Sequence, residues 1–367
     1  MQLLESFFNE EKFKYLFPKR NGLYTYEGFV KAVAKFPYFC GENYHAGVSA
    51  KDTCMREVSA LFAHFVQETS YNSPWLATPA GGGIDRFRQG LYWLEEIGCA
   101  DSCPYLGSGW NAEAWPPQDG EFYYGRGPLQ LSYSYNYGMF SNVFEESTYD
   151  AKMELLVDPG KVVEDPYVAF SAALWFYMTP QSPKPSMHDV MSGLFKPNSV
   201  DSNQGIKGGF GSTINILNGG IECGFGYEVD KAANRGEYYK AFLGYFGLNG
   251  EAEQDLGCAG EKAFQAGGAG DLHAYFEKGE EKDKCKLVSW QTGFTMYARD
   301  DYKRCVCHYW GNGADTCTQA DEADEVVVDN NVDNGANNNG SNDNGADNNG
   351  SDNNGADENA ANKDCIV

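Results

Sequence analysis

The segment from Ala320 to the C-terminus limits how much of this chain can fold. It repeats with a ten-residue period, as NGANNNGSND, NGADNNGSDN and NGADENAANK, and its acidic residues far outnumber the lone Lys363. Such a composition cannot bury enough apolar surface to offset the conformational entropy that folding costs. Calcium-binding repeats also use Asp, Asn and Gly, but the periodic apolar residue of those repeats is missing here. We therefore predict a disordered tail over residues 320–367.

The cysteines indicate an oxidising, extracellular compartment. There are 11 of them, so several disulfides are expected with at least one thiol left over. No signal peptide is visible, because the N-terminus carries charges where an apolar stretch is needed. Residues 261–319 are predicted to form a small cysteine-containing appendage. Cys305, Cys307, His308 and Cys317 could also form a zinc site, but their spacing is not that of a standard finger, and we favour disulfides and no metal.

The charge of the chain excludes two classes of partner. A formal net charge of −24 would be repelled by nucleic acids and by anionic membrane surfaces, so a neutral polymer fits better. The longest apolar run, Tyr167 to Met178, is too short to span a bilayer. It is predicted to be a buried helix that ends near Pro180, which cannot continue it.

Residues 1–260 are predicted to form a mainly α domain. Helical patterns alternate there with Gly-rich and aromatic-rich loops, and no long β-branched alternating series occurs. Ser49 and Asp52 offer an N-terminal cap for one helix, in which Leu61 and Phe65 keep helical spacing. Glu68 follows Phe65 by three residues and so ends this apolar stripe. Partial burial would raise the pKa of its carboxyl group, which is what a general acid near neutral pH requires.

A series of sequence motifs surrounds Glu68 and continues along the chain. They are YTYEGFVKAVAKFP near the start, FAHFVQETS around Glu68, GLYWLEEIG around Glu96, YYGRGPLQLSYSYNYG from Tyr123, WFYMTPQSPKPSMHDV from Trp175 and INILNGGIECGFG from Ile214. In this order, over roughly residues 20–260, they resemble the family 19 glycoside hydrolases, which are chitinases. Several ordered motifs are far more specific than one short Gly-rich match.

This resemblance implies a fold and an activity. The fold would be a lysozyme-like domain, with two helical lobes beside a central substrate cleft. The activity would be endo-acting hydrolysis of chitin or chitooligosaccharides, by a monomer without cofactor. Two carboxyl groups roughly 6.5–9.5 Å apart would admit a water molecule for a single, inverting displacement.

The resemblance also assigns the site residues by position. Glu68 matches the general acid, Glu96 rather than Glu95 the general base, and Ser132 the residue that helps to hold the attacking water. Gln130 and Ser132, two apart in a segment expected to be extended, would point the same way. The sugar-contacting positions are Trp115, Gln130, Tyr135, Asn136 and Asn218.

A supporting network of charged and polar side chains is expected beside the catalytic carboxylates. Arg126 and Arg235 are predicted to pair with carboxylates such as Glu222, in a network near the base. Gln67 stands where the family usually has His, so it can hydrogen-bond but cannot carry a charge. Ser171 replaces a frequent Lys, which removes a cation near the cleft, and His188 is expected to be structural.

The disulfide of the family beside the base is not reproduced, because Tyr92 occupies the cysteine position. The pairs that we predict instead are Cys40–Cys54, Cys99–Cys103 and Cys223–Cys258. Two other functions compete with chitin hydrolysis. One is a lysozyme-like peptidoglycan hydrolase, disfavoured because an acidic protein is repelled by anionic cell walls. The other is a catalytically weakened chitin-binding protein, disfavoured because Glu68, Glu96 and Ser132 are all retained.

Overall fold

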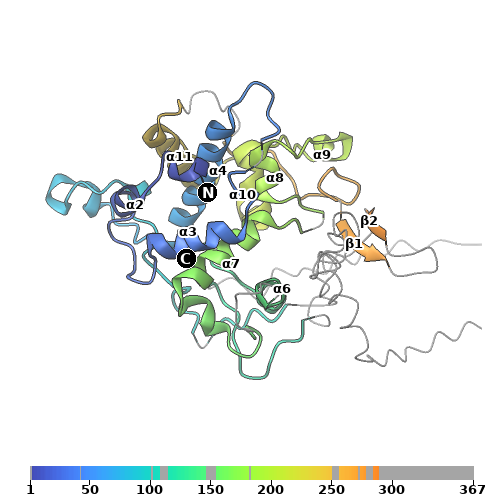
Figure 1. Ribbon diagram of the computed structural model, residues 1–367, viewed down its shortest axis with the longest axis horizontal. Helices are drawn as coiled ribbons and strands as arrows, with labels where there is room; N and C mark the ends of the chain where they lie inside the picture. Colours follow the sequence, from blue (N-terminus) through green and yellow to red (C-terminus); the bar gives the residue numbers. More distant parts are fainter. Residues whose placement is uncertain are drawn as a thin grey trace, which may run out of the picture.

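Helices dominate the computed structural model of the chain (Figure 1). It describes residues 2–271 apart from positions 42, 101, 108–114, 146–153, 182 and 250–255, with the backbone alone for 142–145, and also the backbone of 273–277 and 284–288. The α-helices are α1 (Gln2–Glu5), α2 (Glu10–Leu16), α3 (Tyr26–Lys35), α4 (Ala50–Thr69), α6 (Ser134–Glu145), α7 (Pro166–Met178), α8 (Met187–Ser192), α9 (Ser199–Asn203), α10 (Gly209–Glu222) and α11 (Asp230–Phe246). The mainly α fold predicted from the sequence is confirmed.

The remaining regular elements are short. Four 3-10 helices lie in the connections, namely η1 (Trp75–Ala77), η2 (Pro79–Gly81), η3 (Arg86–Arg88) and η4 (Pro159–Val163). Strands β1 (His273–Glu277) and β2 (Lys284–Val288) form an antiparallel pair in which Phe276 lies opposite Cys285. No helix in the described ranges combines the length and the apolar character needed to cross a membrane.

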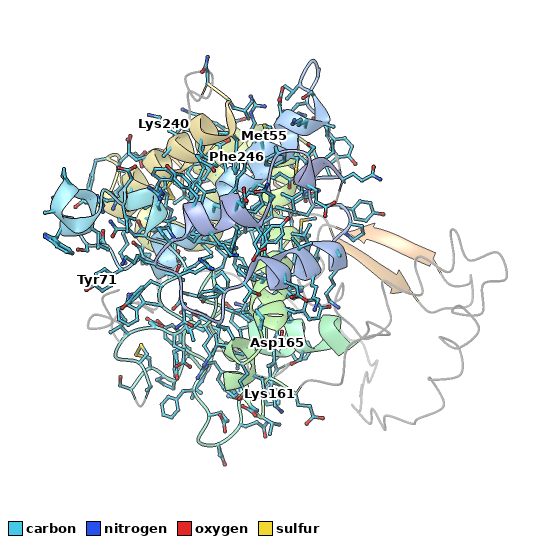
Figure 2. All side chains as sticks on the ribbon, turned by 60° about the vertical axis from the view of Figure 1, so that its left-hand side comes forward. Met55, Tyr71, Lys161, Asp165, Lys240 and Phe246 are labelled. Atoms are coloured by element: carbon cyan, nitrogen blue, oxygen red, sulfur yellow. A yellow bond between two sulfur atoms is a disulfide. The ribbon has the colours of Figure 1, made fainter. Side chains whose placement is uncertain are left out.

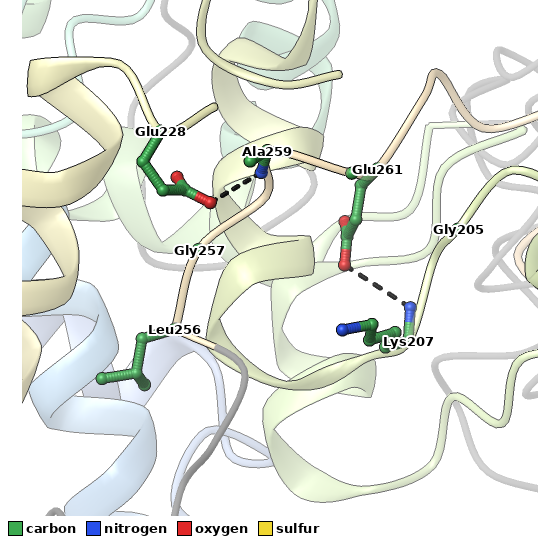
Figure 3. Close-up of a pocket in the computed structure, with 8 residues that line it drawn as sticks. Gly205, Lys207, Glu228, Leu256, Gly257, Ala259 and Glu261 are labelled. Atoms are coloured by element: carbon green, nitrogen blue, oxygen red, sulfur yellow. Dashed lines mark hydrogen bonds between the residues drawn. The ribbon is translucent and has the colours of Figure 1, made fainter. Parts of the chain in front are cut away.

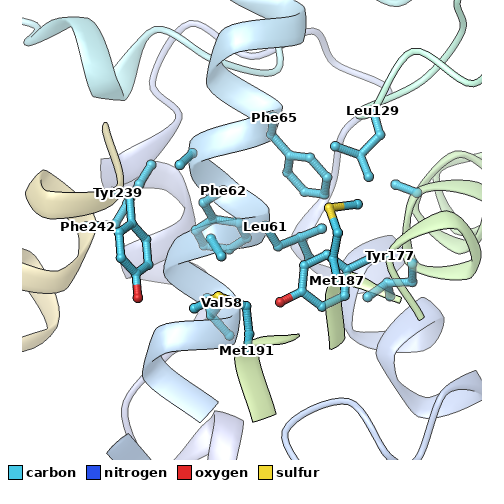
Figure 4. Packing of buried hydrophobic residues seen from close by; sticks show 14 of the residues in the cluster. Val58, Leu61, Phe62, Phe65, Leu129, Tyr177, Met187, Met191, Tyr239 and Phe242 are labelled. Carbon is cyan, nitrogen blue, oxygen red and sulfur yellow. The ribbon is translucent and has the colours of Figure 1, made fainter. Parts of the chain in front are cut away.

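Helix α4 runs through the centre of the larger core (Figures 1 and 4). It begins as predicted, because the Ser49 side chain accepts a hydrogen bond from the Asp52 amide and satisfies one of the free N–H groups of the first turn. Most of the helix is buried, and it packs against α11 and α8. Figure 4 shows Phe242 on one side of α4 and Met187 on the other.

Helix α7 joins this larger core to a second, smaller one. Val168, Ala172 and Trp175, at spacings of four and three, belong to the smaller core. Phe170 and Leu174 belong to the larger core around α4. A helix with a core on each side must be apolar all round, which explains the long apolar run in the sequence. In Figure 2, Met55 and Phe246 lie at the larger core, while Lys161 and Asp165 lie at the opposite end of the molecule.

Three disulfides lie within the described residues. They join Cys40 to Cys54, Cys99 to Cys103 and Cys223 to Cys258, which are the three pairs expected from the sequence. The third pair connects the end of α10 to the segment that follows α11. The other cysteines, including those of the possible zinc site, and the predicted tail lie outside the residues whose side chains are described.

Residues 261–271, which follow the boundary predicted at residue 260, pack against the helical domain. Glu261 is buried and accepts a hydrogen bond from the Ser212 hydroxyl on α10 at 2.8 Å, and Phe264 packs into the larger core. Asp271 is buried as well. The cysteines and polar residues that predict an appendage over 261–319 give no indication of these contacts.

A cavity of about 260 Å³ lies where this segment meets the loop after α9 (Figure 3). It is lined by Gly205, Lys207, Glu228, Leu256, Gly257, Ala259, Gly260 and Glu261. Two of the lining carboxylates are already engaged, since Glu228 accepts from the Ala259 amide at 2.7 Å and Glu261 from the Lys207 amide at 3.4 Å. None of the lining residues belongs to the predicted catalytic site.

Candidate active site

Glu68 lies in the last turn of α4 and continues a buried stripe. Leu61 and Phe65, on the same face, have no exposed surface, whereas the Glu68 side chain is 15% exposed. One carboxylate oxygen accepts a hydrogen bond from Nη2 of Arg235 on α11. The sequence prediction of a carboxyl group at the end of an apolar stripe therefore describes the structure correctly.

Arg235 connects Glu68 to a second carboxylate, Glu222, at the end of α10. The Arg235 Nε and Nη2 atoms each donate to a different Glu222 oxygen at 2.8 Å, which is the bidentate geometry of a strong ion pair. The Asn218 amide also donates to Glu222 at 3.1 Å. Asn218 has non-helical dihedral angles, so α10 is kinked at this residue. Glu222 and Arg235 are both almost completely buried.

The buried position of Glu68 and its charged neighbours together raise the pKa of its carboxyl group. Burial is the largest cause, and the negative charge of Glu222 adds to it, while the positive charge of Arg235 acts in the opposite direction. Arg235 itself stays charged: burial lowers its pKa, but Glu68 and Glu222 raise it by more. A glutamic acid held in this way keeps its proton to higher pH than an exposed one.

The network contains His64 and not Gln67. Nη1 of Arg235 lies 3.1 Å from Nδ1 of His64, whereas Gln67 contributes no hydrogen bond to these residues. The reason is helical geometry. Residue 67 is rotated by about 100° from Glu68, but residue 64 lies one turn earlier on the same face. The i, i+4 spacing in the sequence was the signal that could have identified His64.

Glu96 lies on a loop that is fixed by short backbone pairings. Isolated bridges join Glu95 to Arg126 and Arg126 to Leu131. The Glu96 amide donates to the Gly125 carbonyl at 2.8 Å, and the Gly125 amide donates back to a Glu96 carboxylate oxygen at 3.1 Å. The other oxygen accepts from the Tyr105 hydroxyl at 3.0 Å. Glu96 is half-buried, and these described donors are neutral.

Arg126 pairs with Glu95, whereas Glu222, the carboxylate named in the sequence prediction, pairs with Arg235. Its Nε donates to Glu95 at 3.0 Å, and its guanidinium lies 3.8 Å from the centre of the Tyr124 ring. Nη1 also donates to the Tyr137 hydroxyl at 3.0 Å. The bridge between residues 95 and 126 places these two side chains together, which no spacing in the sequence indicates. Glu95 is therefore occupied by an ion pair, while Glu96 forms none with the residues that the structure describes.

Gln130 lies in a turn and not in the extended segment that was expected, and Ser132 follows the bridge residue Leu131 after this turn. Gln130 has a φ of +50°, in the left-handed region, and its side-chain amide donates to the Gly127 carbonyl at 2.8 Å. The Ser132 hydroxyl donates to the Gln130 carbonyl at 2.9 Å. A Cβ atom at position 125 would lie 2.9 Å from the Cβ of Gln130, so the turn requires glycine there.

The other predicted sugar-contacting residues surround the start of α6. The Asn136 amide donates to the Ser132 carbonyl at 2.8 Å, and its oxygen accepts from Gln181 at 3.0 Å. The Tyr135 ring stacks on Tyr133 at 5.5 Å between centroids. Trp115 packs closely over Gly138, which leaves no room for a side chain there. Gln181 was not predicted as part of the site, although it lies inside one of the sequence motifs.

Comparison with known proteins decides the family. The family model described as class I chitinase matches residues 9–258 of this chain. The chain belongs to this glycoside hydrolase family. Chitinase 9 of Oryza sativa subsp. japonica is 37% identical over 271 residues, which cover 72% of this chain and 73% of the relative. Endochitinase B of Nicotiana tabacum is 36% identical over 248 residues, 67% of this chain and 68% of the relative. Among solved structures, a family GH19 class IV chitinase from Zea mays is 26% identical, with a TM-score of 0.48, over 70% of this chain and 100% of that one.

Two residues singled out in the sequence lie outside the network of Glu68, Arg235 and Glu222. His188 is buried, and its Nδ1 lies 2.6 Å from a carboxylate oxygen of the buried Glu57. Ser171 is fully buried in α7, so a substrate would not contact its side chain. Within the described part of this glycoside hydrolase, no group of three or more His, Cys, Asp or Glu side chains is arranged to hold a metal ion.

Proposed function

We propose that this chitinase cleaves β-1,4-linked N-acetylglucosamine polymers internally, by an inverting mechanism with Glu68 as general acid and Glu96 as general base. The observation that carries the proposal is the contrast between the two carboxyl groups. Burial raises the pKa of Glu68, so it keeps to higher pH than an exposed carboxyl group the proton that it would give to the leaving oxygen. Glu96 is half-buried and receives hydrogen bonds from neutral groups, which suits a base that takes a proton from water.

In the proposed reaction, Glu68 protonates the glycosidic oxygen as the bond to the anomeric carbon breaks. A water molecule attacks that carbon from the opposite face and gives its proton to Glu96, while Ser132 helps to hold the water. One displacement inverts the configuration at the anomeric carbon. Glu222 and Arg235 would hold Glu68 in place, and Gln130, Tyr135, Asn136, Asn218 and Trp115 would contact the sugars. The disulfides suit the extracellular location that we also propose.

The stereochemistry of the first product tests this mechanism. Proton NMR of a freshly cleaved chitin oligomer, read before mutarotation, should show the α-anomer. Initial β-anomer would refute it, because retaining hydrolysis proceeds through two displacements. A fall in the viscosity of a soluble chitin derivative that precedes most of the release of reducing ends would support internal cleavage. Peptidoglycan in a parallel reaction should release no sugars.

A further inference from the structure

Arg235 has three polar edges, and the proposed mechanism uses only two of them. Two nitrogens face Glu222 and one of these also contacts Glu68, but the remaining nitrogen, Nη1, faces His64. His64 is fully buried on α4, one turn before Glu68. A buried N–H group without an acceptor costs about 1–3 kcal/mol, so the partner of Nη1 affects how firmly the guanidinium is held.

The hydrogen bonds around His64 determine which ring nitrogen carries the proton. The Thr213 hydroxyl donates to the Phe210 carbonyl at 2.6 Å, so its oxygen is left to accept. Nε2 of His64 lies 2.9 Å from this oxygen and must be the donor. Nδ1 is then unprotonated and accepts from Arg235 at 3.1 Å. The chain of donors and acceptors is consistent only with a neutral His64 that carries its proton on Nε2.

Packing holds the imidazole ring in this orientation. The His64 ring stacks on Phe210 at 5.2 Å between centroids, and Phe210 stacks on Tyr239 of α11 at 4.3 Å. Burial, together with the charge of Arg235, lowers the pKa of His64 well below its usual value. The ring is therefore fixed by stacking as well as by hydrogen bonds, and it stays neutral.

Neutrality matters for the charge balance beside Glu68. The charges of Arg235 and Glu222 cancel, which leaves Glu68 free to change between its acid and carboxylate forms. A carboxylate at position 64 would draw Arg235 away from Glu68, and a protonated imidazole would repel it. A neutral acceptor satisfies the third edge of the guanidinium without either effect.

From this geometry we propose that His64 is a positioning residue for the reaction: its Nδ1 holds Arg235 between Glu222 and Glu68 and thereby sets where the Glu68 proton is delivered. The proposal rests on the function proposed above, because it assumes that Glu68 is the general acid. His64 itself contacts neither the substrate nor the reacting atoms.

The test compares His64→Leu, which removes the acceptor, with His64→Gln, whose amide offers both an acceptor and a donor. In His64→Leu we expect kcat on a chitin oligomer to fall by about 10- to 100-fold, with KM changed by less than about twofold. Because Arg235 lowers the pKa of Glu68, loosening it should move the basic limb of the pH–rate profile to higher pH. His64→Gln should recover most of kcat and the original profile. His45→Leu, in which the ring lost is bonded to the Met191 carbonyl at 3.0 Å, is the matched control and should leave both unchanged.

Several results would overturn the proposal. The proposal is wrong if His64→Leu keeps the wild-type kcat and pH profile. It is also wrong if kcat falls equally in His64→Gln and His64→Leu, since loss of ring packing alone would then explain both. If His64→Leu does not fold, Thr213→Val replaces it and should give the same shift of the profile at a smaller loss of kcat. No shift in that variant contradicts the proposal.

Nitrogen-15 NMR of labelled histidine in the wild-type protein gives an independent readout. We expect a neutral His64 protonated on Nε2 throughout the active pH range, and protonation on Nδ1 would refute the proposal. Wild-type enzyme and Glu68→Gln are assayed beside the variants. If Glu68→Gln keeps its activity, the proposed function has failed. If it is inactive while His64→Leu is normal, only the role of His64 has failed.

Discussion

Glu68 and Glu96 reach the candidate active site from different kinds of structure. Glu68 comes from α4, the central helix of the larger core, and is tied by Arg235 to a carboxylate on a third element. Glu96 comes from a loop whose shape depends on isolated bridges and on neutral donors. The proposed acid, which must keep its proton, thus lies in buried, ionic surroundings. The proposed base, which must accept a proton, is half-buried and surrounded by neutral donors.

This difference teaches how one fold separates two chemically identical groups. Helix α4 brings a carboxyl group to the edge of a core, where burial acts on its pKa while part of the side chain stays exposed. A loop lets the second carboxylate keep water access, and the ion pair that could disturb it is directed to its neighbour Glu95.

The largest loss of kcat is expected from a change at Glu68, the proposed acid. Glu68→Gln keeps the shape of the side chain but cannot supply a proton, so kcat on chitin oligomers should fall by about 10³-fold or more. Binding of an oligomer, measured by titration calorimetry, should change little. Substantial turnover in this variant would remove Glu68 from the role of acid.

On the base side, Glu96→Gln should lower kcat by about 10²-fold, because water would then be activated without a carboxylate. Glu95→Gln is the matched control. It breaks the ion pair between Arg126 and Glu95, whose side chain is 44% exposed, and should lower kcat by less than about tenfold. A greater loss in Glu95→Gln than in Glu96→Gln would show that the base was assigned to the wrong member of the pair.

The sequence predicted the acid side better than the base side, for a physical reason. Helical periodicity places Leu61, Phe65 and Glu68 on one face, and His64, four residues before Glu68, also lies on that side of the helix. The partner of Arg126 depends on a bridge between residues 31 positions apart, and periodicity carries no information on such pairings.

The turn at Gln130 escaped prediction for a related reason. It requires a positive φ at a residue other than glycine, which the surrounding backbone bonds impose and which the residue type does not indicate. The packing of residues 261–271 likewise depends on contacts with α10 that composition hides.

A smaller effect is expected from Glu222→Gln, and it should appear mainly in the pH dependence. The charge of Glu222 raises the pKa of Glu68, so its removal lowers that pKa. The acid then loses its proton at lower pH, and the basic limb of the kcat profile should move to lower pH. Loss of one partner of a buried ion pair should also lower the free energy of unfolding by up to about 3 kcal/mol, since Arg235 keeps Glu68. If the basic limb of the kcat profile stays at the wild-type pH, Glu222 does not act on the pKa of Glu68.

The smallest effect is expected from Tyr105→Phe, which alters the base side without removing the carboxylate. The Tyr105 hydroxyl donates to one Glu96 oxygen at 3.0 Å, while the Gly125 amide donates to the other at 3.1 Å. Removing one of the two described donors to a group that keeps water access costs about 1 kcal/mol, which corresponds to a roughly fivefold loss of kcat. The loss should appear in kcat and not in KM, because the bond orients the base and not the sugar. Phe at this position keeps the edge-on contact with Tyr133, so the thermal midpoint should barely change. If kcat fell as far as in Glu96→Gln, the hydroxyl itself would have to act on the attacking water, and the base side could no longer be described by a single carboxylate.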